Sequence, residues 1–175
     1  MESEGINSIK INVLSVVTVR FDINKTTKSF IKFLAVSGDF LVVKYDIVPQ
    51  NLKLEITETA IAMDVQRQLD LIERLRCFGF VVEMDDFGSG YSSLNMLSSL
   101  PIDALKMDMK FIQNAAADNR EFRLIELILD IAEFLGVPVI AEGVETENQM
   151  TMLKDAGCDL VQGYYFSKPI PHSYP

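Results

Sequence analysis

Hydrophobic positions from Asn51 onward follow two alternating patterns. Short apolar runs bounded by turn residues predict strands, over 52–56, 80–84, 104–107, 138–141 and 159–163. Between them, hydrophobic residues recur three or four positions apart, which predicts helices with one buried face over 65–78, 91–100, 120–135 and 146–156. Strand–helix alternation of this kind predicts an α/β fold, a parallel sheet with helices on its outside.

Polar residues near the ends of the predicted strands help to choose between two parallel architectures. A flavodoxin-like open sheet and a β/α barrel both fit the periodicity. The residues at or near the C-terminal ends of different strands are Glu55, Asp85, Asp86, Lys106, Glu142 and Gln162. In a barrel those ends share one face, which carries the active site, so the pattern favours a TIM-type barrel. We expect these side chains to converge, with the carboxyl groups of Glu55, Asp85 and Glu142 within ~15 Å of one another.

The first fifty residues are less regular. Residues 9–13 predict a strand with Asn12 near its end, and the apolar stretch over 30–45 is interrupted by Val36–Asp39. Counting that strand gives about six βα units, whereas a full barrel has eight units and typically ~250 residues. We therefore expect a single domain over 1–175 that is an incomplete TIM-type barrel. Its well-patterned portion covers 49–170 and its less regular segment covers 1–48.

Composition and charge argue against several classes of function. The net charge of −9 argues against a protein that binds DNA or RNA polymers, which would carry a basic patch. No apolar run reaches the ~18 residues of a membrane helix, and the acidic Met1–Glu4 does not begin a signal peptide, so a cytoplasmic location is expected. Cys77 and Cys158 lack metal-site spacing, and His172 lies in a proline-rich tail, which leaves little material for zinc or histidine chemistry.

The adjacent pair Asp85-Asp86 indicates cation chemistry. A single acid such as Glu55 or Glu142 is equally well explained as a helix cap or a solvated rim residue. Two neighbouring carboxylates after a buried strand repel each other, and a cation relieves that repulsion. Oxygen ligands without His or Cys suit Mg²⁺, Mn²⁺ or Ca²⁺, and carboxylates that hold two metals are typical of phosphodiester cleavage. Lys106 in the same ring could hold a phosphate oxygen or polarise a water.

Five motifs at these strand ends resemble, in order, the motifs of the EAL-domain family. They are Glu55-Ile-Thr-Glu58, Asp85-Asp86-Phe87-Gly88-Ser89-Gly90, Leu105-Lys106-Met107-Asp108, Ala141-Glu142-Gly143-Val144-Glu145 and Gln162-Gly163-Tyr164-Tyr165-Phe166. The resemblance runs from about Pro49 to Pro169. It implies a phosphodiesterase of bacterial signalling that linearises cyclic di-GMP to pGpG on a modified β/α barrel.

The resemblance also implies a role for each matching residue. It implies a site for two metal ions, Mg²⁺ or Mn²⁺, and implies that Ca²⁺ inhibits. The metal ligands that it implies are Asn12, Glu55, Asp85, Asp86 and Glu142. Catalytic roles beside the attacking water fall to Lys106, Gln162 and, again, Glu142. Glu58 and Glu145 are implied supports, with Glu58 anchoring the Asp-Asp loop. Asn12 stands in Ile-Asn-Val-Leu-Ser, one residue longer than the usual Asn-x-Ser pattern.

The Glu-Ala-Leu motif that names the family does not occur in the sequence. The resemblance therefore covers the C-terminal two-thirds of such a domain, and we expect weakened binding of the first metal because that motif supplies one of its carboxylate ligands. Three hypotheses remain: an active phosphodiesterase, a non-catalytic relative that binds cyclic di-GMP or a protein partner, and a folded fragment without activity.

Six βα units do not close an eight-stranded barrel, so strand edges and apolar interior are left open. We expect either a homodimer that covers the opening or residues 13–43 packed across it. The resemblance adds that residues 87–94 form part of a dimer interface.

Overall fold

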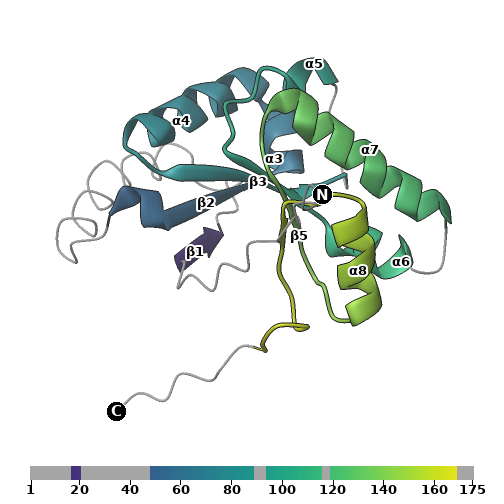
Figure 1. The fold of residues 1–175 in the computed structure, drawn as a ribbon. Helices are drawn as coiled ribbons and strands as arrows, with labels where there is room; N and C mark the ends of the chain where they lie inside the picture. Colours follow the sequence, from purple (N-terminus) through teal and green to yellow (C-terminus); the bar gives the residue numbers. More distant parts are fainter. Residues whose placement is uncertain (1–16, 21–47, 89–93, 116–118, 169–175) are drawn as a thin grey trace, which may run out of the picture.

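The computed structural model describes residues 17–20, 48–88, 94–115 and 119–168 (Figure 1). Within them six parallel strands form one sheet whose order follows the chain. They are β1 (Val17–Arg20), β2 (Leu52–Thr57), β3 (Val81–Phe87), β4 (Ala104–Met107), β5 (Val139–Ala141) and β6 (Leu160–Val161). Parallel neighbours that are consecutive in the chain, joined through helices, are the arrangement of a TIM-type barrel wall.

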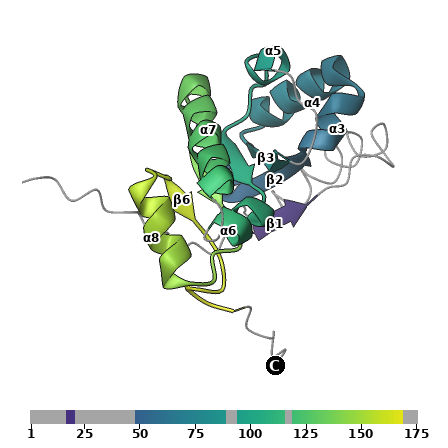
Figure 2. The same cartoon turned by 90° about the vertical axis from the view of Figure 1, so that its right-hand side faces the viewer.

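Helices connect the strands on the outside of the sheet. They are the 3-10 helix η3 (Pro49–Asn51), α3 (Glu58–Met63), α4 (Val65–Cys77), α5 (Leu94–Leu97), α6 (Met109–Ala115), α7 (Asn119–Leu135) and α8 (Glu147–Asp155). Helices α4, α5 and α7 arch over the same side of the sheet, and α8 lies beside β6 (Figures 1 and 2). None of the described helices is long and apolar enough to cross a membrane.

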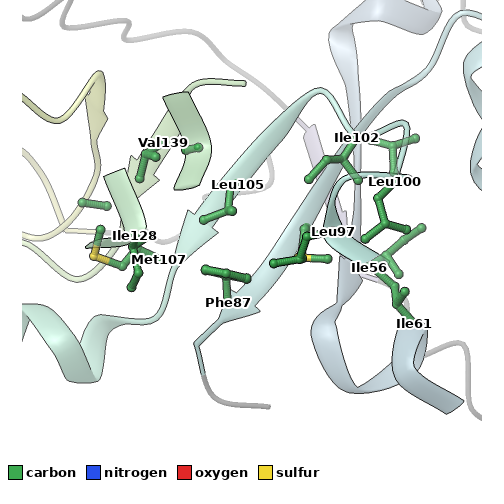
Figure 3. Close-up of a cluster of buried hydrophobic side chains, with 14 of the residues drawn as sticks. Ile56, Ile61, Phe87, Leu97, Leu100, Ile102, Leu105, Met107, Ile128 and Val139 are labelled. Carbon is green, nitrogen blue, oxygen red and sulfur yellow. The ribbon is translucent and has the colours of Figure 1, made fainter. Parts of the chain in front are cut away.

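The two faces of the sheet differ in chemistry. Between β2 and β3, Leu54 pairs with Val82 and Ile56 pairs with Met84. Met84 pairs in turn with Leu105 of β4, so these apolar side chains share one face of the sheet. That face packs against the helices and forms the core, where Ile56, Leu105 and Met107 lie with helix residues (Figure 3). The alternate positions, among them Glu55, Glu83 and Lys106, occupy the other face, because successive side chains of a strand point to opposite sides.

Most elements lie where the hydrophobic pattern predicts them. Helix α8 begins at the predicted Thr146 cap, whose hydroxyl accepts from the amide of Gln149 while the Gln149 side chain bonds back to Thr146. The predicted helix over 91–100 is shorter than expected, because the described helix there ends at Leu97. Helices α3 and α6 and strand β1 were not predicted. The predicted strand over 9–13, with Asn12, and the expected cover by residues 13–43 lie outside the described residues, apart from β1.

Candidate active site

Three carboxylates from three strands of the sheet, β2, β3 and β5, meet at its C-terminal edge. Glu55 lies on β2, Asp85 on β3 and Glu142 directly after β5. One oxygen of each lies within 4.8 Å of the others, well inside the ~15 Å expected of a barrel. Glu55 and Asp85 are buried, and the Glu142 side chain is 17% exposed, so the cluster opens to solvent on the Glu142 side.

A bulge in β3 sets the position of the Asp-Asp pair. Met84 pairs with Leu105 and Phe87 with Met107, so Asp85 and Asp86 together stand opposite the single residue Lys106. A bulge of this kind redirects side chains and is common beside active sites. Asp86 takes a left-handed backbone conformation, with φ of 55°. Among the described residues, the others with a positive φ are all glycines. Asp85 thereby points into the cluster, whereas Asp86 is half-buried beside it and is not one of the three clustered carboxylates.

Lys106 on β4 joins the three carboxylates. Its ammonium donates a hydrogen bond to Glu55, lies 2.5 Å from Oε1 of Glu142 and lies 3.4 Å from Oδ1 of Asp85. The Lys106 side chain is only 4% exposed. A buried ammonium is stable when it is paired, and here its neighbours are all carboxylates.

The neighbours of Lys106 determine its charge state. Burial lowers the pKa of Lys106, but hydrogen bonds to Glu142 and Glu55 and the attraction of Glu142 and Asp85 outweigh burial and raise that pKa above its ordinary value of 10.5. The side chain is therefore a cation at neutral pH. Burial raises the pKa of Glu142 above its ordinary value of 4.5, despite the opposing hydrogen bond from Lys106. Three carboxylates thus compete for one ammonium.

Glu58 holds the loop that follows the Asp-Asp pair. This glutamate opens α3, is 2% exposed, and accepts a hydrogen bond of 3.0 Å from the backbone amide of Gly88. Gly88 has φ of 92°, and a Cβ at this position would lie 2.6 Å from the ring of Phe111, so a glycine is required there. The contact ties the first turn of α3 to the end of β3. The resemblance implies an anchoring role for Glu58 in this loop.

Gln162 reaches the cluster from the last strand. Its Nε2 donates to Oε1 of Glu142 over 2.5 Å. The loops after β5 and β6 are bonded through their backbones, because the Val144 amide donates to the Gln162 carbonyl and the Tyr165 amide donates to the Val144 carbonyl. At Gly163, a Cβ would lie 2.1 Å from the Val144 carbonyl oxygen, so only glycine allows this approach. The two loops therefore hold Glu142 and Gln162 at a fixed separation.

A cavity of about 530 Å³ opens beside Glu142 and Gln162. Its wall mixes apolar and charged side chains, and the lining residues are Met109, Glu142, Gly143, Glu145, Gln162, Gly163, Tyr164, Ser167 and Lys168. Glu145, for which the resemblance implies a supporting role, is an exposed residue of this wall. A space of this size next to a carboxylate cluster is large enough for a small organic ligand.

The sequence reasoning did not single out Lys53 and Glu83. Each stands two residues before a cluster residue, and their side chains form an ion pair of 2.6 Å. Glu83 is 3% exposed and Lys53 is 30% exposed. The available signal is a charged residue inside an otherwise apolar strand, on the same face as Glu55 and Asp85 by the two-residue period.

Comparison with known proteins decides the family. The sequence model of the EAL domain matches residues 15–169 of this chain. The chain belongs to the EAL domain family. Over 120 residues, 69% of the chain, it is 46% identical to the cyclic di-GMP phosphodiesterase NbdA of Pseudomonas aeruginosa. It spans only 15% of the length of that relative.

Solved EAL structures share the fold. PaMucR phosphodiesterase, solved in a complex with c-di-GMP, superposes with a TM-score of 0.81 at 32% identity, covering 88% of this chain and 61% of the other. Klebsiella pneumoniae BlrP1, solved with manganese and cyclic di-GMP, superposes with a TM-score of 0.75 at 26% identity, covering 87% of this chain and 38% of the other. The incomplete TIM-type barrel predicted from the sequence agrees with these neighbours.

The donor set of this EAL domain fits a hard divalent cation. Its three clustered carboxylates, Glu55, Asp85 and Glu142, each offer an oxygen within 4.8 Å of the others. Oxygen-only ligands at that spacing suit Mg²⁺, Mn²⁺ or Ca²⁺. Of the two other predicted ligands, Asp86 lies beside the cluster and Asn12 lies outside the described residues.

Proposed function

We propose that this EAL domain is a cyclic-di-GMP-specific phosphodiesterase that hydrolyses cyclic di-GMP to pGpG. The observation that carries the proposal is the meeting of Glu55, Asp85, Glu142 and Lys106 at the C-terminal edge of a parallel sheet. In TIM-type barrels that edge carries the catalytic residues. The relative NbdA, a cyclic di-GMP phosphodiesterase by name, supports the choice of substrate.

The proposed site divides its work between metal ligands and supports. Glu55, Asp85 and Glu142 would hold Mg²⁺ or Mn²⁺, with Asp86 and Asn12 as further ligands. A bound metal of this kind supplies a strong nucleophile from water and stabilises charge on the phosphate. Lys106 and Gln162 orient the groups around Glu142, since both bond to its carboxylate.

Further parts of the proposal concern ions, supports and assembly. Glu58 anchors the loop after Asp86, and Glu145 supports the wall of the neighbouring cavity. Ca²⁺ inhibits, because it fills the site with a looser geometry than Mg²⁺ demands. A homodimer through residues 87–94 and a cytoplasmic location complete the proposal. The side chain of Phe87 is buried in the core of its own protomer, so the proposed contacts fall to the residues after it.

The experiment is hydrolysis of cyclic di-GMP by the 175-residue chain in Mn²⁺ or Mg²⁺, followed by chromatography of pGpG. We expect turnover that stops with EDTA and falls at least about 100-fold in Asp85→Asn, which removes a metal ligand. Glu73→Gln is the matched control, because Glu73 is an exposed acid of α4. Turnover that survives both EDTA and Asp85→Asn would exclude the proposed mechanism.

A second candidate is a cyclic-di-GMP-binding module without hydrolysis. The contacts of Lys106 favour it, because its ammonium already lies against all three carboxylates that would hold a metal. Calorimetric titration with cyclic di-GMP in Ca²⁺ separates the two. Binding without turnover in Mn²⁺ supports the module, and turnover supports the enzyme.

A further inference from the structure

The Lys106 ammonium uses the same carboxylates that would hold a metal. Its three possible donors face three different partners, Glu55, Asp85 and Glu142. The contacts involve Oε1 of Glu55, Oδ1 of Asp85 and Oε1 of Glu142. One ammonium thus stands where three carboxylate side chains converge.

An ammonium and a divalent cation compete at this cluster. Both draw on the oxygens of the same three carboxylates, and like charges a few ångströms apart repel strongly where water is scarce. Without any cation the three carboxylates would repel one another across less than 4.8 Å. A positive charge at the cluster relieves that repulsion, and among the described residues Lys106 supplies one.

We propose that Lys106 is an internal counter-ion that holds the carboxylate cluster together until a divalent cation binds, and is then displaced from part of its contacts. The inference rests on the metal site of the proposed function. Lys106 accordingly stabilises the metal-free fold and lowers the affinity for metal. The two effects are linked, because the contacts between Lys106 and the carboxylates that stabilise the metal-free protein must be broken when the metal binds.

The test compares Lys106→Met with Lys53→Met. Lys53 forms a separate ion pair with Glu83 on the same face of the sheet, so the same substitution breaks a Lys–carboxylate pair outside the cluster. For Lys106→Met we expect a lower thermal midpoint without metal, a larger rise of that midpoint with Mn²⁺, and Mn²⁺ affinity at least about tenfold higher. Lys53→Met should lower the midpoint while changing Mn²⁺ affinity less than about threefold.

Isothermal titration and thermal melts supply these values, and neither uses cyclic di-GMP. If Lys106→Met is unfolded without metal, its refolding by Mn²⁺ gives the same answer. If that variant does not fold in either condition, the lysine NH₃⁺ resonance of the unaltered protein decides. A Lys106 signal that shifts as Mg²⁺ binds supports displacement, and an unchanged signal during binding overturns it.

The outcomes separate this inference from the proposed function. Unchanged or weaker Mn²⁺ binding by Lys106→Met, beside normal binding by the unaltered protein, overturns only the role of Lys106. If neither protein binds Mn²⁺ at millimolar concentration, the metal site itself is wrong and both proposals fail.

Discussion

The two edges of the sheet use carboxylates in different ways. At the N-terminal edge, Asp103 precedes β4 and accepts a 2.8 Å hydrogen bond from the Val82 amide of β3. Asp159 precedes β6 and accepts a 3.0 Å bond from the Val139 amide of β5 in the same manner. Each of these acids bonds a backbone amide of the preceding strand. At the C-terminal edge, by contrast, three acids share one ammonium.

This difference separates structural acids from candidate functional ones. An acid that bonds the backbone of a neighbouring strand fixes register and does not need a further cation. Acids crowded together repel, and such a cost persists at sites where function requires it. The Lys53–Glu83 pair lies between the edges and is intermediate, with one acid for one base. Each of these other acids therefore has a donor of its own, whereas the three acids of the candidate site share one ammonium.

Outside the carboxylate cluster, the largest change in stability is expected for Lys53→Met. It leaves Glu83, which is 3% exposed, as a buried charge without its ammonium. Breaking a buried pair in this way typically costs about 3–5 kcal/mol, and the 30% exposure of Lys53 places this pair at about 3 kcal/mol. Urea denaturation measures the loss.

The double variant Lys53→Met with Glu83→Leu is the control. Removing both charges restores apolar burial, so we expect most of the stability to return. A double variant as unstable as Lys53→Met would show that packing of the Lys53 stem, rather than its charge, stabilises the sheet there.

A smaller loss is expected at the N-terminal edge. Asp103→Ala leaves the Val82 amide without its acceptor and removes the 3.0 Å ion pair with Arg76. We expect about 1–2 kcal/mol lower stability in urea, and unchanged Mn²⁺ affinity, because Asp103 stands at the edge opposite the cluster. Asp159→Ala is the matched variant with a smaller expected loss, since Asp159 is exposed. Altered Mn²⁺ affinity in Asp103→Ala would show that the two edges are coupled.

Sequence patterns predicted the strands and the candidate site because both depend on local spacing. Buried parallel strands require continuous apolar runs, which is why the run over 104–107 coincides with β4. Polar residues directly after such runs fall on one edge, so the amino-acid order alone groups Glu55, Asp85, Lys106 and Glu142. Their meeting is a consequence of parallel topology.

The features that the pattern missed depend on short segments or on contacts across the sheet. Helix α3 has only six residues, too few to show a clear hydrophobic period. It begins at Glu58, directly after Thr57, which ends β2 and caps the helix by accepting from the Ala60 amide. The bulge at Asp85-Asp86 appears only in the register with β4. That Lys106 contacts all three carboxylates likewise depends on side-chain reach, which spacing along the chain does not encode.

The smallest effect concerns the cysteines and reports on the N-terminal edge alone. Cys77 is exposed, whereas Cys158 is buried just before Asp159 and donates to the Leu160 carbonyl over 3.3 Å. Burial raises the pKa of Cys158 to about 11, so at pH 8 roughly one thiol in a thousand is ionised.

With Ellman's reagent at pH 8 we expect Cys77 to react at once and Cys158 only on unfolding. Cys77→Ser should therefore abolish the fast phase. In that background Asp159→Ala should speed Cys158 labelling several-fold with little loss of global stability, because one of the hydrogen bonds between the start of β6 and β5 is gone. Equal rates with and without Asp159 would mean that Cys158 is protected by global folding, and that the acids of this edge fix register without limiting local opening.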